Sequence, residues 1–153
     1  MNKLLFYFLY VSVLFFLISC SEQKSKSRVS NEREAIYQPS EMAITMRQMV
    51  LDMESVKHKL KAGTIDVKDL NHIIFAHSSI ATDEPTDIEE IQPSFEIFSQ
   101  TYIEQLEELK QIIRINGEIS DQILLFNSAL TTCISCHTDH CPGPISKIKK
   151  LKI

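Results

Sequence analysis

The chain has 153 residues and a formal net charge of −4, and hydrophobic residues make up 44% of it. It contains three glycines and no tryptophan, and strand-and-turn patterning is scarce, so the composition gives no support to a β-rich fold. The negative charge gives no indication of nucleic-acid binding, and no nucleic-acid partner is expected.

The chain begins with "MNKLLFYFLYVSVLFFLISC", in which Lys3 precedes an apolar run from Leu4 to Ile18. A positive start, an apolar middle and a small residue before the cut are the layout of a secretory signal peptide. An uncleaved membrane anchor is the alternative, because the run is near the lower length limit for crossing a bilayer. The ending "LISC" resembles the bacterial lipobox, which implies that residues 1–19 are removed and that Cys20 is lipidated and anchors the protein to a membrane.

The mature chain is therefore expected in the cell envelope, facing the periplasm, where thiols do not stay reduced by default. Ser21, rather than aspartate, follows the lipidated cysteine, which by resemblance to the Gram-negative sorting rule slightly favours the outer membrane. Residues 20–39 carry many serines and charges but few large apolar side chains, so they are predicted to form a flexible tether. The predicted folded domain is residues 40–153, which is long enough for a single core.

Four amphipathic helices are predicted in the domain, because apolar residues recur there every three or four positions. The predicted helices start at Ser40, near Asp66, at Ser94 and near Glu118, and they end at Gly63, before "ATDEPTD", at Asn116-Gly117 and at His140. The inner stripe of the first helix is Met42, Met46, Met49, Met53, Val56 and Leu60, and that of the last is Ile119, Ile123, Phe126, Leu130, Cys133 and His137. Short links join the first helix to the second and the third to the fourth, and a longer loop joins the second to the third. The prediction is therefore an all-α, up-down-up-down four-helix bundle.

The last predicted helix contains Cys133-Ile-Ser-Cys136-His137, which is C-x-x-C-H, the signature of c-type haem attachment. Two thiols three residues apart on a helix can add to the two vinyl groups on one edge of a porphyrin. The adjacent histidine can then direct a ring nitrogen at the iron. We therefore expect one covalent haem c, held by Cys133 and Cys136, with His137 as the proximal iron ligand.

Two other uses of these residues have to be weighed. Cys133, Cys136, His137, His140 and Cys141 are all possible zinc ligands, but structural zinc sites usually draw two pairs from separated segments. A redox disulfide between the first two cysteines is also possible, although thioredoxin-like chemistry expects a βαβ pattern that the sequence lacks. Haem is favoured over both. The remaining Cys141 is expected to be a free thiol or a link to another chain, which leaves a homodimer open.

A four-helix bundle with C-x-x-C-H late in its last helix resembles the cytochrome c′ family. The resemblance covers residues 40–140, and its specific motif is Cys133 to His137; the rest is helix order, the stripe of the first helix and Gly63 after it. The chain departs from the family in its His-Cys-Pro-Gly-Pro turn and in the extra Cys141. The resemblance therefore implies the fold more directly than it implies the second iron ligand or the function.

The residue on the other side of the iron is expected to come from the first helix, because the fourth helix of such a bundle ends where the first begins. Met46 is the first candidate and Met42 the second, and histidine–methionine ligation is typical of electron-transfer haems with raised potentials. The alternative is an open, five-coordinate iron, with the methionine stripe serving as core. His77 is a lower-ranking candidate, for which core or surface packing is favoured.

The expected function is that of a lipid-anchored monohaem c-type cytochrome, which carries single electrons between redox protein partners in the periplasm or membrane. No carboxylate pair, nucleophile with a base or phosphate-binding loop indicates an enzyme. Two alternatives stay open: a five-coordinate haem protein that binds small gases such as nitric oxide, as cytochrome c′ proteins do, and a haem subunit of a larger membrane complex. The C-terminal "KIKKLKI" is interpreted either as a docking site for an acidic partner or anionic surface or as a solvated end.

Overall fold

The computed structural model describes residues 38–153, so the predicted signal peptide, Cys20 and nearly all of the predicted tether lie outside the described residues. The described part of the chain is all-α, without a strand. Its helices are α2 (Glu41–Ala62), α3 (Val67–His77), α4 (Ser94–Arg114), α5 (Ile119–His140) and the short α6 (Ile145–Lys149). Two 3₁₀ helices, η1 (Ser78–Ala81) and η2 (Ile88–Glu90), lie in the loop between α3 and α4. None of the helices between residues 38 and 153 is long and apolar enough to cross a membrane.

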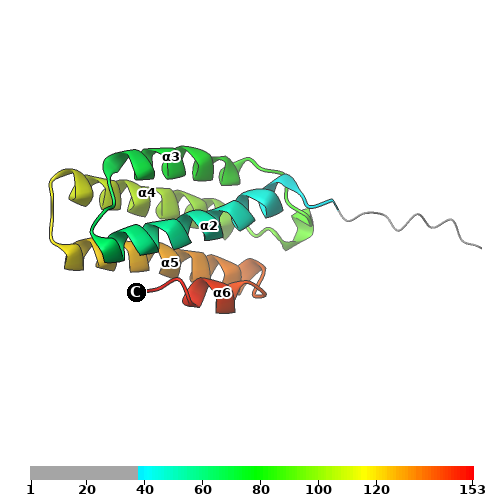
Figure 1. Cartoon of the computed structure of the whole chain (residues 1–153). Coiled ribbons are helices and arrows are strands. Elements are labelled where there is room, and N and C mark those ends of the chain that lie inside the picture. The colour runs from blue at the N-terminus through cyan, green and yellow to red at the C-terminus, as the bar shows by residue number, and fades with distance from the viewer. Residues whose placement is uncertain (1–37) are drawn as a thin grey trace, which may run out of the picture. The chain divides into compact units, whose positions relative to one another are not determined.

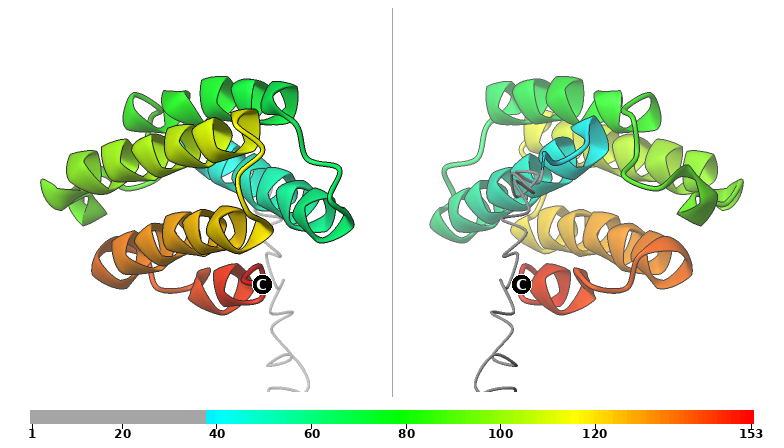
Figure 2. Two further views of the ribbon diagram at one scale, coloured as in Figure 1. Left: turned by 90° about the vertical axis from the view of Figure 1, so that its left-hand side faces the viewer. Right: turned by 90° about the vertical axis from the view of Figure 1, so that its right-hand side faces the viewer.

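Successive long helices run in alternating directions, as the colour gradient in Figure 1 shows. Helix α4 packs most extensively against α5 and also against α3, while α6 packs on α5. Figure 2 shows α3 and α4 on one side of the domain and α5 and α6 on the other, with α2 crossing between them. Helix α2 contacts α5 at few points. The arrangement therefore leaves α2 and α5 apart over much of their length.

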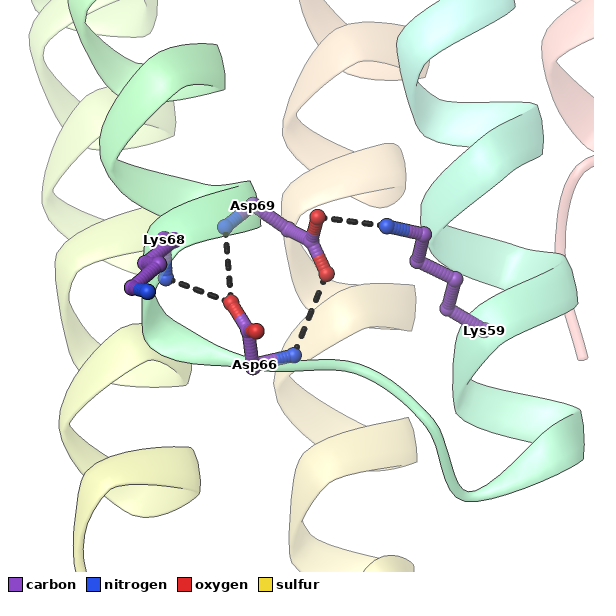
Figure 3. A network of polar contacts seen from close by, with 4 residues as sticks. All are labelled: Lys59, Asp66, Lys68 and Asp69. Atoms are coloured by element: carbon purple, nitrogen blue, oxygen red, sulfur yellow. Dashed lines mark hydrogen bonds and ion pairs between the residues drawn. The ribbon is translucent and has the colours of Figure 1, made fainter.

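The first two helices are bounded by residues with the expected capping chemistry. Ser40 caps α2 by accepting a hydrogen bond from a backbone N–H in the first turn, and Gly63 ends the helix at a φ of 65°, which favours glycine. Asp66 and Asp69 form a reciprocal capping box at the start of α3. Lys59 of α2 pairs with Asp69 and holds the pKa of that carboxyl below its usual value (Figure 3). These contacts fix the turn that joins α2 to α3.

The inner stripes of the helices meet in one main core. The apolar side chains with the least exposure are Val56, Leu60, Leu70, Leu106, Leu109, Phe126, Ala129 and Leu130. Burying one such aliphatic or aromatic side chain stabilises the fold by about 1.5–3 kcal/mol. Ile119 departs from the predicted stripe: it is 47% exposed, because it lies in the first turn of α5 beside the α4–α5 turn.

The C-terminal segment is part of the fold. Ile148 and Leu151 are only 5% and 6% exposed and belong to the main core. Lys57 of α2 donates a hydrogen bond of 2.7 Å to the carbonyl oxygen of Lys150, which ties the segment to the first helix. The interpretation of "KIKKLKI" as a solvated end is therefore wrong. Its apolar residues anchor it, while its lysines leave it strongly basic.

Candidate functional site

A cavity of about 880 Å³ is lined by α2, α4, α5, α6 and the loop between α3 and α4. This volume lies within the range of about 300–1,000 Å³ that is typical of ligand and cofactor sites. Most of its wall is apolar, and the methionines of α2 contribute to one part of it. Those methionines are Met42, Met46, Met49 and Met53. The site is thus the space left where α2 and α5 stand apart.

Helix α5 brings the C-x-x-C-H residues to the cavity wall. Cys133, Cys136 and His137 all line the cavity, because positions three and four apart share one face of a helix. Both cysteines are partly buried free thiols. Burial, reinforced by the neighbouring Cys136, raises the pKa of Cys133 to about 12. Burial, together with Asp139, raises the pKa of Cys136 to about 11.

The surroundings of the two thiols bear on the two rival chemistries. Disulfide exchange uses the thiolate, which these apolar surroundings disfavour at neutral pH. Within residues 38–153, no group of three or more His, Cys, Asp or Glu side chains is arranged to hold a metal ion. The surroundings of Cys133 and Cys136 thus suit neutral thiols that lie against an apolar ligand.

His137 has a defined orientation at the cavity wall. Its Nδ1 lies 2.9 Å from the carbonyl oxygen of Cys141. Because a carbonyl oxygen only accepts, Nδ1 carries the proton and donates it, which leaves the lone pair on Nε2. A histidine that ligates a metal usually has its other ring nitrogen fixed in this way. The turn after α5 therefore supplies an orienting contact that the sequence motif alone did not reveal.

The methionines of α2 differ in their surroundings. Met53 is 2% exposed in the main core, and Met42 is 7% exposed in a second cluster with Ile80 and Phe95. Met46 is partly buried and packs against this second cluster, as Cys136 of α5 also does. Both predicted distal ligands thus line the cavity. Met46 has the more accessible side chain of the two.

His77 is not free to bind iron. It is 1% exposed, its Nδ1 lies 2.8 Å from the hydroxyl oxygen of Tyr102, and its Nε2 lies 3.0 Å from Oδ2 of Asp52. Both ring nitrogens are therefore occupied by side chains. Sequence reasoning missed Asp52 as a partner, although this acid directly precedes the stripe residue Met53.

His140 supports one edge of the cavity. Its Nδ1 accepts a 3.1 Å hydrogen bond from the backbone N–H of Gln92, and its Nε2 lies 3.3 Å from Oγ of Ser94. Its ring meets the rings of Phe95 and Phe98 edge-on. These contacts join the end of α5 to the start of α4 and to the loop just before it.

The cavity and its donor set are compatible with a covalently held haem. Two thiols and one histidine with an available Nε2 lie on one wall, and the volume and apolar lining suit a flat, largely apolar group. Comparison of the chain with protein-family models, curated proteins and solved structures finds no match.

Proposed function

We propose that the protein is a lipid-anchored, four-helix-bundle monohaem c-type cytochrome that carries single electrons between redox protein partners in the periplasm or membrane. The observation that supports this best is the position of the C-x-x-C-H residues. Cys133, Cys136 and His137 line a mostly apolar cavity of about 880 Å³. Haem bound there would supply one-electron redox chemistry.

Each residue of the motif has a separate task in this proposal. Cys133 and Cys136 hold the cofactor through thioethers, and Nε2 of His137 is the proximal ligand. The carbonyl oxygen of Cys141 keeps the imidazole in the required tautomer by accepting the Nδ1 proton. The surrounding apolar side chains suit the apolar faces of the cofactor.

Met46 is the proposed distal ligand, with Met42 as the second choice. Met46 is partly exposed, lines the cavity and borders the same apolar cluster as Cys136. A thioether ligand favours electron transfer, because it closes the iron to other ligands and raises its potential. The alternative function is the binding of small gases at an open iron. Gas binding is supported by the packing of Met42 against Ile80 and Phe95. A methionine of this stripe that serves as core leaves one fewer to bind the iron.

Replacing Met46 with alanine is expected to convert a closed iron into an open one. The ferric protein should lose the weak long-wavelength absorption of a thioether-bound haem, and the ferrous protein should bind carbon monoxide roughly tenfold faster or more. Visible spectra and stopped-flow mixing measure both changes.

Leu60→Ala is the matched control for this substitution. Leu60 also lies on α2 but in the main core and away from the cavity lining, so its removal should cost about 2–5 kcal/mol of stability and leave the spectrum unchanged. A wild-type ferrous protein that is high-spin and binds carbon monoxide rapidly would exclude Met46 as a ligand. Gas binding would then become the better proposal.

The proposed membrane attachment depends on Cys20, which lies outside the described residues. Cys20→Ala is expected to abolish the acyl modification and, because the lipobox is lost with it, the removal of residues 1–19. Ser21→Ala is the matched control, which should keep both. Mass spectrometry of the membrane-extracted proteins measures both changes, and a wild-type chain that carries no acyl chains at Cys20 would contradict lipid anchoring.

A further inference from the structure

Three polar side chains from three different helices meet in the interior of the domain. Asp52 of α2, His77 of α3 and Tyr102 of α4 form one hydrogen-bonded chain, with distances of 3.0 Å and 2.8 Å. The rings of His77 and Tyr102 also stack, with centroids 5.9 Å apart. His77 and Tyr102 are only 1% and 3% exposed. A buried polar chain of this kind is costly unless every group is satisfied, and here each is.

The direction of each hydrogen bond follows from the chemistry of the end groups. An ionised Asp52 can only accept, so Nε2 of His77 carries a proton and donates it. In the neutral imidazole, Nδ1 then accepts from the hydroxyl of Tyr102. A second proton on His77 would reverse this bond, because Nδ1–H would donate to the tyrosine oxygen. The chain thus offers partners for both protonation states of His77.

The chain connects the solvent side of the domain to the cavity. The Asp52 side chain is 17% exposed, whereas Tyr102 at the other end lines the cavity. Tyr102 is close enough to Cys133 that the cysteine's charge, after burial, contributes to the raised pKa of the phenol. His77 is therefore one hydrogen bond from the cavity wall.

The protonation of His77 is set by opposing effects. Burial lowers its pKa below the usual value, and the hydrogen bond and charge of Asp52 work against this. Exposed His72 on the same helix lowers the pKa slightly further, and Tyr102 is the titratable group that faces His77 from α4. A unit change of charge within about 10 Å shifts the pKa of such a group by roughly one unit at an effective dielectric constant of about 20.

We propose that Asp52, His77 and Tyr102 form a redox-linked proton site: Nδ1 of His77 takes up one proton from solvent when the group in the cavity takes up one electron, and the carboxylate of Asp52 stabilises the imidazolium that results. This inference rests on the proposed cytochrome function. The electron comes from an external one-electron donor, and the proton compensates the positive charge that the cavity loses. Reoxidation returns the Nδ1 proton to solvent.

The expected signature is a reduction potential that depends on pH. Between the pKa of His77 in the oxidised protein and its higher pKa in the reduced protein, the potential should fall as the pH rises. A tenfold difference in proton affinity between the two redox states gives a total fall of about 59 mV. Outside this interval the contribution of His77 is constant.

Spectroelectrochemical titration of the haem-loaded full chain over roughly pH 4–9, centred near the usual histidine pKa, tests the proposal. His77→Gln should lose the fall in potential, whereas His58→Gln, at an exposed position of α2, should keep it. Asp52→Asn removes the charge that favours protonated His77, so it should move the fall to lower pH. It also keeps the test decisive if His77→Gln does not fold.

Nuclear magnetic resonance of ¹⁵N-labelled histidine gives a second readout that does not depend on electron-transfer activity. His77 should titrate at a higher pH in the reduced protein than in the oxidised protein. The same potential curve in His77→Gln and wild type, or one His77 pKa in both redox states, would overturn the proton site and leave the cytochrome proposal intact. A chain that carries no haem after c-type maturation would overturn both.

Discussion

A variant in which Cys133 and Cys136 are both alanine is expected to retain no covalent haem. Both thiols lie at the cavity wall, and Cys141 is the remaining cysteine among residues 38–153. The double variant therefore has no sulfur in the motif that can form a thioether. The amount of haem that stays with the denatured polypeptide, measured by visible absorbance, should fall from one per chain to none.

The single variants and one control make this result specific. Cys136→Ala should keep at most one thioether, which leaves one vinyl group intact and shifts the ferrous absorption bands. Cys141→Ala, at an exposed cysteine outside the motif, should keep the wild-type amount of covalent haem. Retention of covalent haem by the double variant, or its loss in the Cys141 variant, would contradict the assignment.

The apoprotein, made without haem maturation, is expected to lose stability in alkaline solution. Cys133 and Cys136 have folded-state pKa values of about 12 and 11, above the usual value of 9.0. Between pH 9 and these values the unfolded chain binds fewer protons than the folded chain, so the free energy of unfolding falls as the pH rises. For Cys133, three pKa units correspond to about 4 kcal/mol. Water that reaches the cavity screens part of this energy, so we expect the free energy of unfolding to fall by about 2 kcal/mol.

Urea unfolding of the apoprotein at pH 8, 9, 10 and about 11 measures this loss. The apoprotein of the double alanine variant provides the control, because it lacks only the two thiols. The haem-loaded protein should also lack the thiol-dependent loss, since a thioether sulfur has no proton to release. Parallel alkaline profiles for the wild-type and variant apoproteins would show that the thiols do not titrate as the structure indicates.

The helices were predictable because their signals are local. Ser40 and Gly63 bound α2 as expected, and Asn116, at a φ of 52°, closes the end of α4 before Gly117. A side chain at Gly117 would meet Ile112 at 2.7 Å, so the turn requires glycine. Capping and the spacing of apolar residues depend on residues within one or two helical turns of one another, so both can be recognised in a single sequence.

Contacts between distant residues were not predictable in the same way. Asp52 and Tyr102 each lie 25 residues from His77 in the sequence, and periodicity says which face of a helix is inner but not which side chains meet there. Helix α6 was missed because it has five residues, and its two apolar ones, Ile145 and Ile148, are too few to establish a period. The motif predicted the position of the candidate site, but the methionines of α2 are spaced by whole turns and all line the cavity, so the stripe could not single out one of them.

The most direct test is the fate of the haem when the wild-type protein is denatured. The protein should be purified from cells that contain a c-type maturation system, extracted with acidified organic solvent, and weighed intact by mass spectrometry. The colour should stay with the polypeptide, whose mass should increase by one haem, with Cys133 and Cys136 both modified. Colour in the organic layer with two unmodified thiols, or stoichiometric zinc in place of haem, would contradict the proposed function.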